Sequence, residues 1–285
     1  MSSRPVWING SLTGSIDPRD RGFLLGDGVF DTLVAFARRP FAGDRHLQRL
    51  GEHATAIGLA FDANHIRTAW DVVLSASPSD HTVLRTTVTR GVTARDLWPA
   101  IATEPTIVVS ASPWDSSLAG RAIRLVTSTV RRNADSPTSR LKTIGYLDNI
   151  LAAREVVAAG ADDALLLGRD GHVACTTIAN IFVLTGNRLL TPPSEDGVLP
   201  GITRQLVLEK AEALGFEARE QSLRIADLEA ATGIFATNSV RLARPVVALD
   251  GRPLPADADG GIDRIAAAVA EMIEVECATN PRTAG

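Results

Sequence analysis

The sequence has little cysteine, no long apolar run and little excess charge, and each shortage excludes a class of protein. Its two cysteines, Cys175 and Cys277, are too few for a disulfide framework or a four-ligand zinc site. No apolar run approaches the roughly 20 residues that span a bilayer, and the N-terminal segment contains no signal-peptide core. The formal net charge of −4 offers no basic surface for nucleic acid. We therefore expect a cytoplasmic protein without a membrane or nucleic-acid partner.

Lysine is nearly absent, although the chain has 29 basic residues. Only Lys142 and Lys210 are lysines, and the other 27 (29 less 2) are arginines, which stay protonated and cannot act as amine nucleophiles. The helical pattern around Lys210 is typical of a solvated side chain. Lys142 lies in SRLKTIGYLDN, outside any amphipathic pattern and just before a helix. It is therefore a candidate nucleophile, with an ordinary loop charge as the alternative.

Strand-like and helix-like segments follow one another along the whole chain, which indicates an α+β protein with mixed sheets and flanking helices. A stretch rich in Ser, Pro and Gly at 113–121 is the best candidate for a linker, so we expect two domains, 1–115 and 116–285. The expected strands are 5–12, 29–36, 81–91, 104–112, 123–130, 161–168, 172–175, 178–186, 216–223, 233–239 and 244–251. The expected helices are about 44–58, about 62–76 with Asp62 as its cap, 148–160, one that begins within 198–215, and about 262–275.

A glycine-bearing loop runs into a helix at GVLPGITR, residues 197–204. The N–H groups and the positive dipole end of such a helix attract anions, and Thr203 adds a hydroxyl there. A second small polar cluster, 237–239, closes a strand and offers further donors, while Arg49 in HLQRL supplies a positive charge. Taken alone, these features also fit an ordinary loop-to-helix junction and a surface arginine. Together they make a candidate phosphate site.

Motifs for metals and for several nucleotide cofactors are missing. The five histidines, at 46, 53, 65, 81 and 172, show no HxH or HExxH spacing, so no zinc or iron site is indicated. No GxSxG elbow, Walker loop or GxGxxG fingerprint occurs. A candidate amine combined with a candidate phosphate site, without metal-ligand spacing, favours pyridoxal phosphate, which needs both.

Six motifs occur in an order that resembles the class IV aminotransferase family, fold type IV of the pyridoxal-phosphate enzymes. They are DRGFLLGDGVFDTL, HLQRL, LKTIGYLDNILAAREVVAAGADDALLL, GHVACTTIANIFVL, LLTPPSEDGVLPGITRQLVLE and FATNSVRLARPV. The resemblance extends over about residues 5–255. The family includes branched-chain aminotransferases, D-amino acid aminotransferases, (R)-selective amine transaminases and 4-amino-4-deoxychorismate lyases. The resemblance implies two domains with the active site between them, and pyridoxal 5′-phosphate as the cofactor.

The resemblance also assigns roles to single residues. Lys142 matches the lysine that forms the Schiff base with the cofactor and then moves a proton between the substrate Cα and the cofactor C4′. Tyr146, the only tyrosine in the chain, matches a residue that bonds the cofactor's phenolic oxygen, with packing at a helix start as the alternative. The residues matched to phosphate binding are Arg49, Ile202, Thr203, Asn238 and Ser239.

Two positions depart from the family pattern. Cys175 stands where the family has a glutamate that pairs with the protonated pyridine nitrogen. A thiol holds such a proton poorly, so we expect slower or altered chemistry, unless Cys175 only packs within its strand. Phe30 stands where D-amino acid aminotransferases often carry a tyrosine over the cofactor, which removes one hydroxyl near the substrate.

The resemblance places recognition of the substrate carboxylate in TRGVTARDLWP. Arg90 and Arg95 lie where D-amino acid aminotransferases have a TRGxxxRxH motif, whose second arginine binds the α-carboxylate. Leu97 replaces the histidine of that motif. An arginine suits the role because it binds a carboxylate through two parallel hydrogen bonds, although a solvated loop arginine is an equal alternative for Arg95.

The sequence thus predicts a pyridoxal-phosphate aminotransferase that acts on an amino acid, with D-amino acids among the candidates, and a 2-oxo acid. One alternative is 4-amino-4-deoxychorismate lyase, which uses the same lysine but releases pyruvate. The other is a cofactor-binding protein with weak transaminase activity, because Cys175 replaces the usual glutamate. The resemblance further implies a homodimer in which residues 85–98 reach into the partner's active site.

Overall fold

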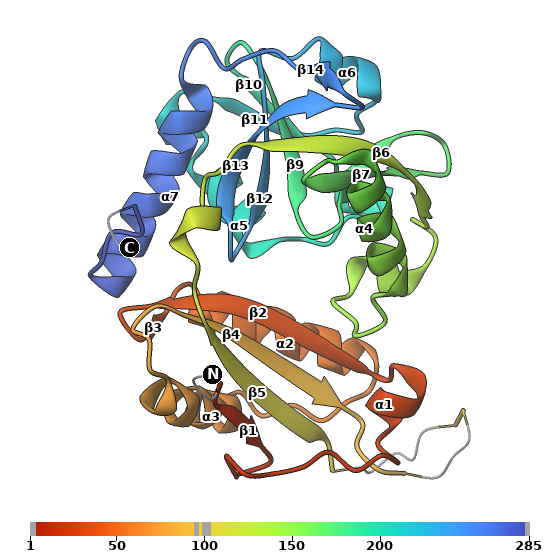
Figure 1. Cartoon of the computed structure of the whole chain (residues 1–285), viewed down its shortest axis with the longest axis vertical. Helices are drawn as coiled ribbons and strands as arrows, with labels where there is room; N and C mark the ends of the chain where they lie inside the picture. Colours follow the sequence, from red (N-terminus) through yellow and green to blue (C-terminus); the bar gives the residue numbers. More distant parts are fainter. Residues whose placement is uncertain (1–3, 94–96, 99–103, 283–285) are drawn as a thin grey trace. The chain divides into compact units, whose positions relative to one another are not determined.

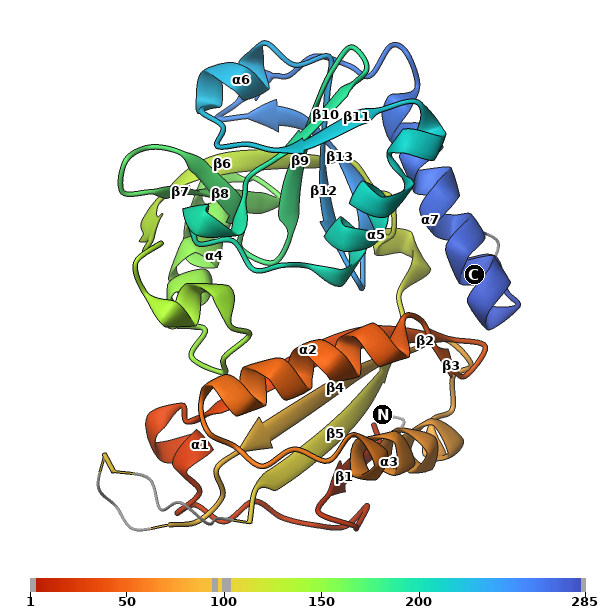
Figure 2. The ribbon, with the colours of Figure 1, turned by 180° about the vertical axis from the view of Figure 1, so that it is seen from behind.

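The computed structural model describes residues 4–93, 97–98 and 104–282, and the chain forms two compact units, each built around one sheet (Figures 1 and 2). The chain first passes from one unit to the other after Trp114. Two later segments, one of which contains Lys142, belong to the first unit again. The first unit comprises Met1–Trp114, Leu141–Gly145 and Ile273–Ala284, and the second comprises Asp115–Arg140 and Tyr146–Met272.

An antiparallel five-stranded sheet forms the frame of the first unit, with the strand order β1-β5-β4-β2-β3. β2 is almost entirely buried, and its valine, threonine and phenylalanine side chains favour a strand. It pairs with β4 from Gly28 opposite Thr89 to Ala35 opposite Thr82. The strands are β1 (Val6–Ile8), β2 (Gly28–Phe36), β3 (Arg39–Pro40), β4 (Thr82–Thr89) and β5 (Thr106–Pro113).

Two long helices cover this sheet, and their apolar faces form the core with it (Figure 2). Leu47 and Leu50 of one helix and Ile66 and Trp70 of the other are buried in that core. Asp62 caps the second helix by accepting two main-chain N–H groups, as expected. The helices of this unit are α1 (Arg21–Leu25), α2 (Gly43–Ala56) and α3 (Ala63–Ala76), so the expected helices at 44–58 and 62–76 are confirmed.

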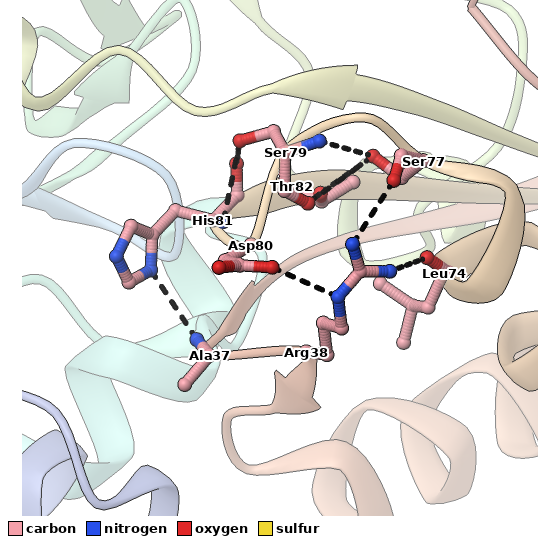
Figure 3. A network of polar contacts seen from close by, with 8 residues as sticks. All are labelled: Ala37, Arg38, Leu74, Ser77, Ser79, Asp80, His81 and Thr82. Carbon is pink, nitrogen blue, oxygen red and sulfur yellow. Dashed lines mark hydrogen bonds and ion pairs between the residues drawn. The ribbon is translucent and has the colours of Figure 1, made fainter.

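The turn between β2 and β3 is tied to neighbouring elements by a polar network (Figure 3). Ala37 and Arg38 adopt left-handed conformations with φ of 47° and 63°. The Arg38 guanidinium donates to Asp80 at 2.9 Å and to the carbonyl of Ser77 at 3.2 Å, and His81 Nδ1 accepts the N–H of Ala37 at 3.3 Å. These bonds offset the strain of the turn and fix one end of β2.

The second unit contains a mixed nine-stranded sheet. Its main path runs β11-β10-β9-β12-β13-β6-β7-β8, with β14 beside β13. β8 also pairs with β9, through Cys175 opposite Asn180, so the path returns on itself. The strands are β6 (Ile123–Arg132), β7 (Asp163–Gly168), β8 (Val173–Thr176), β9 (Asn180–Thr185), β10 (Arg188–Thr191), β11 (Glu217–Glu220), β12 (Gly233–Asn238), β13 (Leu242–Leu249) and β14 (Arg252–Pro253).

Four helices complete the fold: α4 (Leu147–Ala159), α5 (Ile202–Lys210), α6 (Ile225–Glu229) and α7 (Gly261–Cys277). Gly160 ends α4 in the left-handed conformation with φ of 61°, as expected of a glycine at that place. Among the described residues, no helix is long and apolar enough to cross a membrane. The 3₁₀ turns are η1 (Ser116–Leu118), η2 (Pro137–Arg140), η3 (Ser194–Asp196) and η4 (Glu212–Leu214).

The expected α+β class with mixed sheets is confirmed. The elements that were not expected are short: β3, β10, β14, α1 and α6 contain two to five residues each. A segment of that length is too short to show a strand or helix period. β10 forms because Leu189 and Leu190 are buried and pair with β9, a reason that only the folded chain reveals.

Candidate active site

Lys142 lies in a short extended segment beside β2, in the first unit. Its carbonyl accepts the main-chain N–H of Phe30 at 2.9 Å, and Ile144 donates to the carbonyl of Gly28 at 3.1 Å. The segment therefore continues the sheet at the β2 edge that β3 leaves uncovered. Sheet bonding fixes the main chain of the candidate nucleophile, so Lys142 does not sit on a free loop.

The side chain of Lys142 is half-buried among cations and an aromatic ring. Its Nζ lies 4.5 Å from the ring centroid of Phe30, and the Arg85 guanidinium lies 3.6 Å from the same centroid. Burial lowers the pKa of Lys142 to about 8, with Arg49 and Arg85 adding to the effect and Asp31 opposing it. About half of the Lys142 side chains are then neutral amines at pH 8, which suits a nucleophile.

Asp31, His46 and Arg49 form a buried cluster where α2 packs on β2. Arg49 donates from Nε and Nη2 to the two carboxylate oxygens of Asp31, both at 2.8 Å, and His46 Nδ1 lies 2.7 Å from Asp31 Oδ1. Burial raises the pKa of Asp31, but Arg49 and His46 outweigh it and hold that pKa well below its usual range. Asp31 is therefore charged and compensates part of the positive charge of Arg49.

His53 lies on the same face of α2 and is only 6% exposed. Its Nδ1 accepts the main-chain N–H of Lys142 at 3.1 Å. Burial and Arg49 lower the pKa of His53 to about 4, with Lys142 adding to them and Asp31 and Glu52 opposing. The imidazole is therefore neutral at pH 7.

Asp31, His53 and Arg85 were not singled out from the sequence. One signal was available: His46, Arg49 and His53 recur at i, i+3 and i+7, which puts three polar side chains on one face of a helix. A polar stripe on a helix that packs on a sheet indicates a buried polar site. The partners of that stripe come from β2 and from the Lys142 segment, and no local pattern identifies them.

In the second unit, the start of α5 offers main-chain N–H groups to an anion. The N-cap residue Gly201 makes no side-chain capping bond, so the first-turn N–H groups, including those of Ile202 and Thr203, have no acceptor within the helix. A Cβ at position 201 would lie 2.1 Å from Oδ1 of Asn180, so only glycine fits there. Asn180 also donates to the carbonyl of Leu199 at 2.9 Å, which fixes the loop. This geometry fits a phosphate.

The end of β12 adds polar groups, and α5 packs against β12. Thr237 Oγ1 is buried and has no hydrogen-bond partner among the described residues. Such a group calls for an explanation, and contact with an anionic ligand is one that suits a hydroxyl donor. Asn238 Oδ1 accepts the N–H groups of Val240 and Arg241, so it shapes the turn that contains Ser239.

Cys175 is buried on β8, in a small apolar cluster with Ala174 and Val198. Burial raises the pKa of its thiol, against the opposing effect of Arg132 and with a further rise from Asp163. The thiol is therefore neutral at pH 7. Tyr146 is half-buried as the residue that precedes α4, in the same unit.

Arg90, one of the two residues expected to bind the substrate carboxylate, is buried and bonded to protein groups. Arg90 is 4% exposed and donates from Nε and Nη2 to Asp27 at 2.8 and 3.1 Å. It also donates to the carbonyls of Gly58 at 3.0 Å and Ile57 at 2.6 Å. The bonds to Asp27 hold the end of β4 to the residue before β2, and the other two hold it to the chain after α2. Arg95, the other expected carboxylate-binding residue, lies outside the described residues.

These residues fit pyridoxal phosphate. Lys142 is an amine with a lowered pKa, as a cofactor bound through a Schiff base requires. Within the second unit alone, the start of α5 and Thr237 offer helix N–H groups and a buried hydroxyl without a partner among the described residues, as a phosphate requires. Within the described ranges, no group of three or more His, Cys, Asp and Glu side chains is arranged to hold a metal ion.

Comparisons with known proteins give the same result. A relative from Methanocaldococcus jannaschii, named for branched-chain-amino-acid aminotransferase activity, is 33% identical over 255 residues, 87% of this chain and 88% of that protein. The Mycobacterium tuberculosis "Bifunctional aminodeoxychorismate lyase / D-amino acid transaminase" is 32% identical over 257 residues, 83% of this chain and 86% of that protein. The structure of a T.th. branched-chain amino acid aminotransferase, complexed with N-(5′-phosphopyridoxyl)-L-glutamate, has a TM-score of 0.86 and 26% identity, and covers 97% of this chain and 95% of that chain.

The family model described as "Amino-transferase class IV" matches residues 28–249, a range that runs from the start of β2 to the end of β13. It includes the Lys142 segment, the start of α5 and the turn after β12. The chain therefore belongs to the class IV aminotransferase family, whose members use pyridoxal phosphate.

Proposed function

We propose that this protein is a pyridoxal-phosphate-dependent aminotransferase that exchanges an amino group between an amino acid and a 2-oxo acid. The observation that carries the proposal is Lys142, a half-buried amine with a pKa of about 8 and a main chain bonded on both sides. Membership of the class IV family supports the same reaction, because relatives named as branched-chain and D-amino acid aminotransferases match most of the chain.

Each unit contains residues that we assign to cofactor binding. In the first unit, Lys142 supplies the amine and Arg49 a positive charge for the phosphate. Phe30 places its ring beside the amine, and we assign it to the substrate-binding side. In the second unit, the main-chain N–H groups at the start of α5 bind the phosphate, and Thr237 Oγ1 is a further donor. We assign the second-unit contacts to Tyr146, Cys175, Ile202, Thr203, Thr237, Asn238 and Ser239.

The chemistry of Lys142 follows from its surroundings. When bound, pyridoxal phosphate draws electrons from the substrate Cα and so makes its C–H bond acidic. Lys142 Nζ takes up that proton, because an amine with a pKa of about 8 is a usable base near neutral pH. The ring of Phe30, 4.5 Å away, stabilises the ammonium that results, until the proton is delivered to complete the transfer.

A second candidate activity is 4-amino-4-deoxychorismate lyase. It is favoured by one observation, the 32% identity with a protein named both as aminodeoxychorismate lyase and as D-amino acid transaminase. Both activities need a lysine and the same cofactor. The substrates therefore distinguish them, because the lyase releases pyruvate.

We also propose a cytoplasmic homodimer. Two large apolar side chains three residues apart, and so on one face of α4, are exposed: Leu147 at 65% and Ile150 at 55%. Apolar groups of this size gathered on a surface are typical of a protein–protein interface. A second copy of the chain is the partner that the family resemblance implies.

A half-reaction screen tests the proposed function. Protein loaded with pyridoxal phosphate is mixed with single D- or L-amino acids without a 2-oxo acid, and the 2-oxo acid formed is quantified. We expect about one equivalent from the preferred substrates, and the D/L comparison then gives the stereochemical preference. Bound cofactor without any conversion would contradict the proposal, and pyruvate release from aminodeoxychorismate would establish the lyase activity instead.

A further inference from the structure

The main-chain N–H of Lys142 is held by a side chain from another element. His53, on α2, accepts this hydrogen at 3.1 Å, and the two residues are 89 positions apart in the sequence. We propose that His53 is a positioning residue that fixes the main chain of the catalytic lysine through an unprotonated Nδ1. This inference rests on the proposed function, in which Lys142 carries the cofactor and the proton.

The hydrogen bond from the Lys142 N–H determines the protonation state and the tautomer of the His53 imidazole. A main-chain N–H can only donate to a ring nitrogen that has a free lone pair, so Nδ1 is unprotonated and the neutral ring carries its hydrogen on Nε2. An imidazolium has no such acceptor and would break the bond. His53 therefore acts only as long as it stays neutral.

The groups around His53 keep it neutral. Burial and the Arg49 and Lys142 cations disfavour its protonation, whereas Asp31 and Glu52 favour it. Asp31 is the stronger of the two favouring charges, but burial and Arg49 outweigh it. The pKa of His53 is lowered to about 4, so the bond to Lys142 persists throughout the neutral range.

Two bonds then define the position of Lys142. Its carbonyl accepts from Phe30 on β2, and its N–H donates to His53 on α2. Together they orient the Cα–Cβ bond and therefore the point from which the amine reaches its target. Loss of the His53 acceptor would leave one main-chain donor unsatisfied and release one side of the segment.

Two substitutions of His53 test whether Lys142 needs a hydrogen-bond acceptor at this position or only a side chain of similar shape. His53→Asn places an amide oxygen where Nδ1 lies, because both atoms are bonded to Cγ. His53→Leu places a methyl group there instead. The reactivity of the Lys142 amine is measured in the whole chain without cofactor. Trace acetylation across pH 6–10 is quantified by mass spectrometry of the peptide that contains Lys142. Lys210, the only other lysine, is exposed and serves as the reference in the same sample.

We expect the asparagine variant to reproduce the wild-type profile of Lys142, with a midpoint near pH 8. The leucine variant should shift that midpoint upward and slow covalent attachment of pyridoxal phosphate, fixed by borohydride, about tenfold, the effect of one lost hydrogen bond. Lys210 should be unchanged in all three proteins. The same midpoint and attachment rate in the leucine variant as in the wild type would overturn the proposal. An equal shift and an equal loss of rate in the asparagine and leucine variants would overturn it too.

A measurement on the unmodified protein covers the case in which the leucine variant does not fold. Nitrogen-15 NMR at pH 7 should show His53 neutral, with its hydrogen on Nε2. A hydrogen on Nδ1 would overturn the proposal. Neither labelling nor NMR needs the cofactor, so both test His53 even if the protein fails to bind pyridoxal phosphate, a result that would contradict the proposed function alone.

Discussion

The guanidinium carbon of Arg85 lies 3.6 Å from the ring centroid of Phe30, and the same centroid is 4.5 Å from Lys142 Nζ. The two cationic centres are therefore at most 8.1 Å apart, the sum of those distances. Arg85 sits on β4 and Phe30 on the adjacent strand β2, so the sheet itself places a permanent positive charge near the nucleophile. That charge adds to the effect of burial on the pKa of Lys142.

Arg85→Gln should raise the pKa of Lys142 above about 8, because it removes a nearby positive charge. We expect a shift of about half a unit, the size of a screened interaction across several ångströms. Trace acetylation of Lys142 against pH measures it. Arg85→Lys keeps the charge and should leave the profile unchanged. A glutamine variant that titrates like the wild type would show that burial, Asp31 and Arg49 set the pKa of Lys142 without Arg85.

Lys142→Ala should abolish both the borohydride-fixable attachment of pyridoxal phosphate and turnover, because the chain then lacks the proposed nucleophile. Lys210→Ala should retain both, since Lys210 lies exposed at the end of α5. Peptide mapping after borohydride reduction locates the attached cofactor. A cofactor mapped to Lys210, or to no lysine, would remove Lys142 from the mechanism.

Stability should depend on pH through His53. Above pH 6.5 the imidazole is neutral in the folded and unfolded chain, so it has no effect. As the pH falls from 6.5 to about 4, the unfolded chain binds a proton that the folded chain refuses, and the free energy of unfolding decreases by up to about 3 kcal/mol. Urea unfolding at several pH values measures this slope. His53→Asn should lack this contribution, and the same slope in both proteins would assign it to other groups.

Cys175→Glu should raise the rate of the amino-acid half-reaction. The buried thiol is neutral, whereas a carboxylate forms a charge-assisted bond with a pyridinium nitrogen, a difference that corresponds to about tenfold. Single-turnover mixing of the wild type, Cys175→Glu and Cys175→Ala measures the effect. If the alanine variant matches the wild type and the glutamate variant, with its cofactor bound, gains nothing, Cys175 serves only to pack β8.

The proposed homodimer predicts a sedimenting mass of about twice 30.2 kDa. Ile150→Glu should weaken association, because it puts a charge into the exposed apolar face of α4. Val72→Glu, on α3, is the matched control and should not change the mass. A fully active monomer at assay concentration would contradict the dimer and the expectation that residues 85–98 reach the partner's site.

Local patterns predicted what is local. Lys142 stands out because lysine is scarce, and the start of α5 is visible as a glycine-bearing loop before a helix. The contacts that make these features a site join distant residues: Arg49 meets Asp31 across 18 positions, and His53 meets Lys142 across 89. Arg90 is another residue whose contacts no local pattern predicts. Its place in a motif indicated substrate binding, but its partner Asp27, 63 positions earlier, could only be found in the folded chain.

The closed path of the second sheet affects how this protein meets other chains. β8, the strand of Cys175, is bonded to β7 at three residue pairs and to β9 at Cys175, so both of its edges have a partner strand. β11 is one end of the main path, and it is a short, exposed run of alternating charge at Glu217, Arg219 and Glu220. Charged side chains at a sheet end disfavour strand addition. Such an arrangement should slow self-association into fibrils when the enzyme is concentrated.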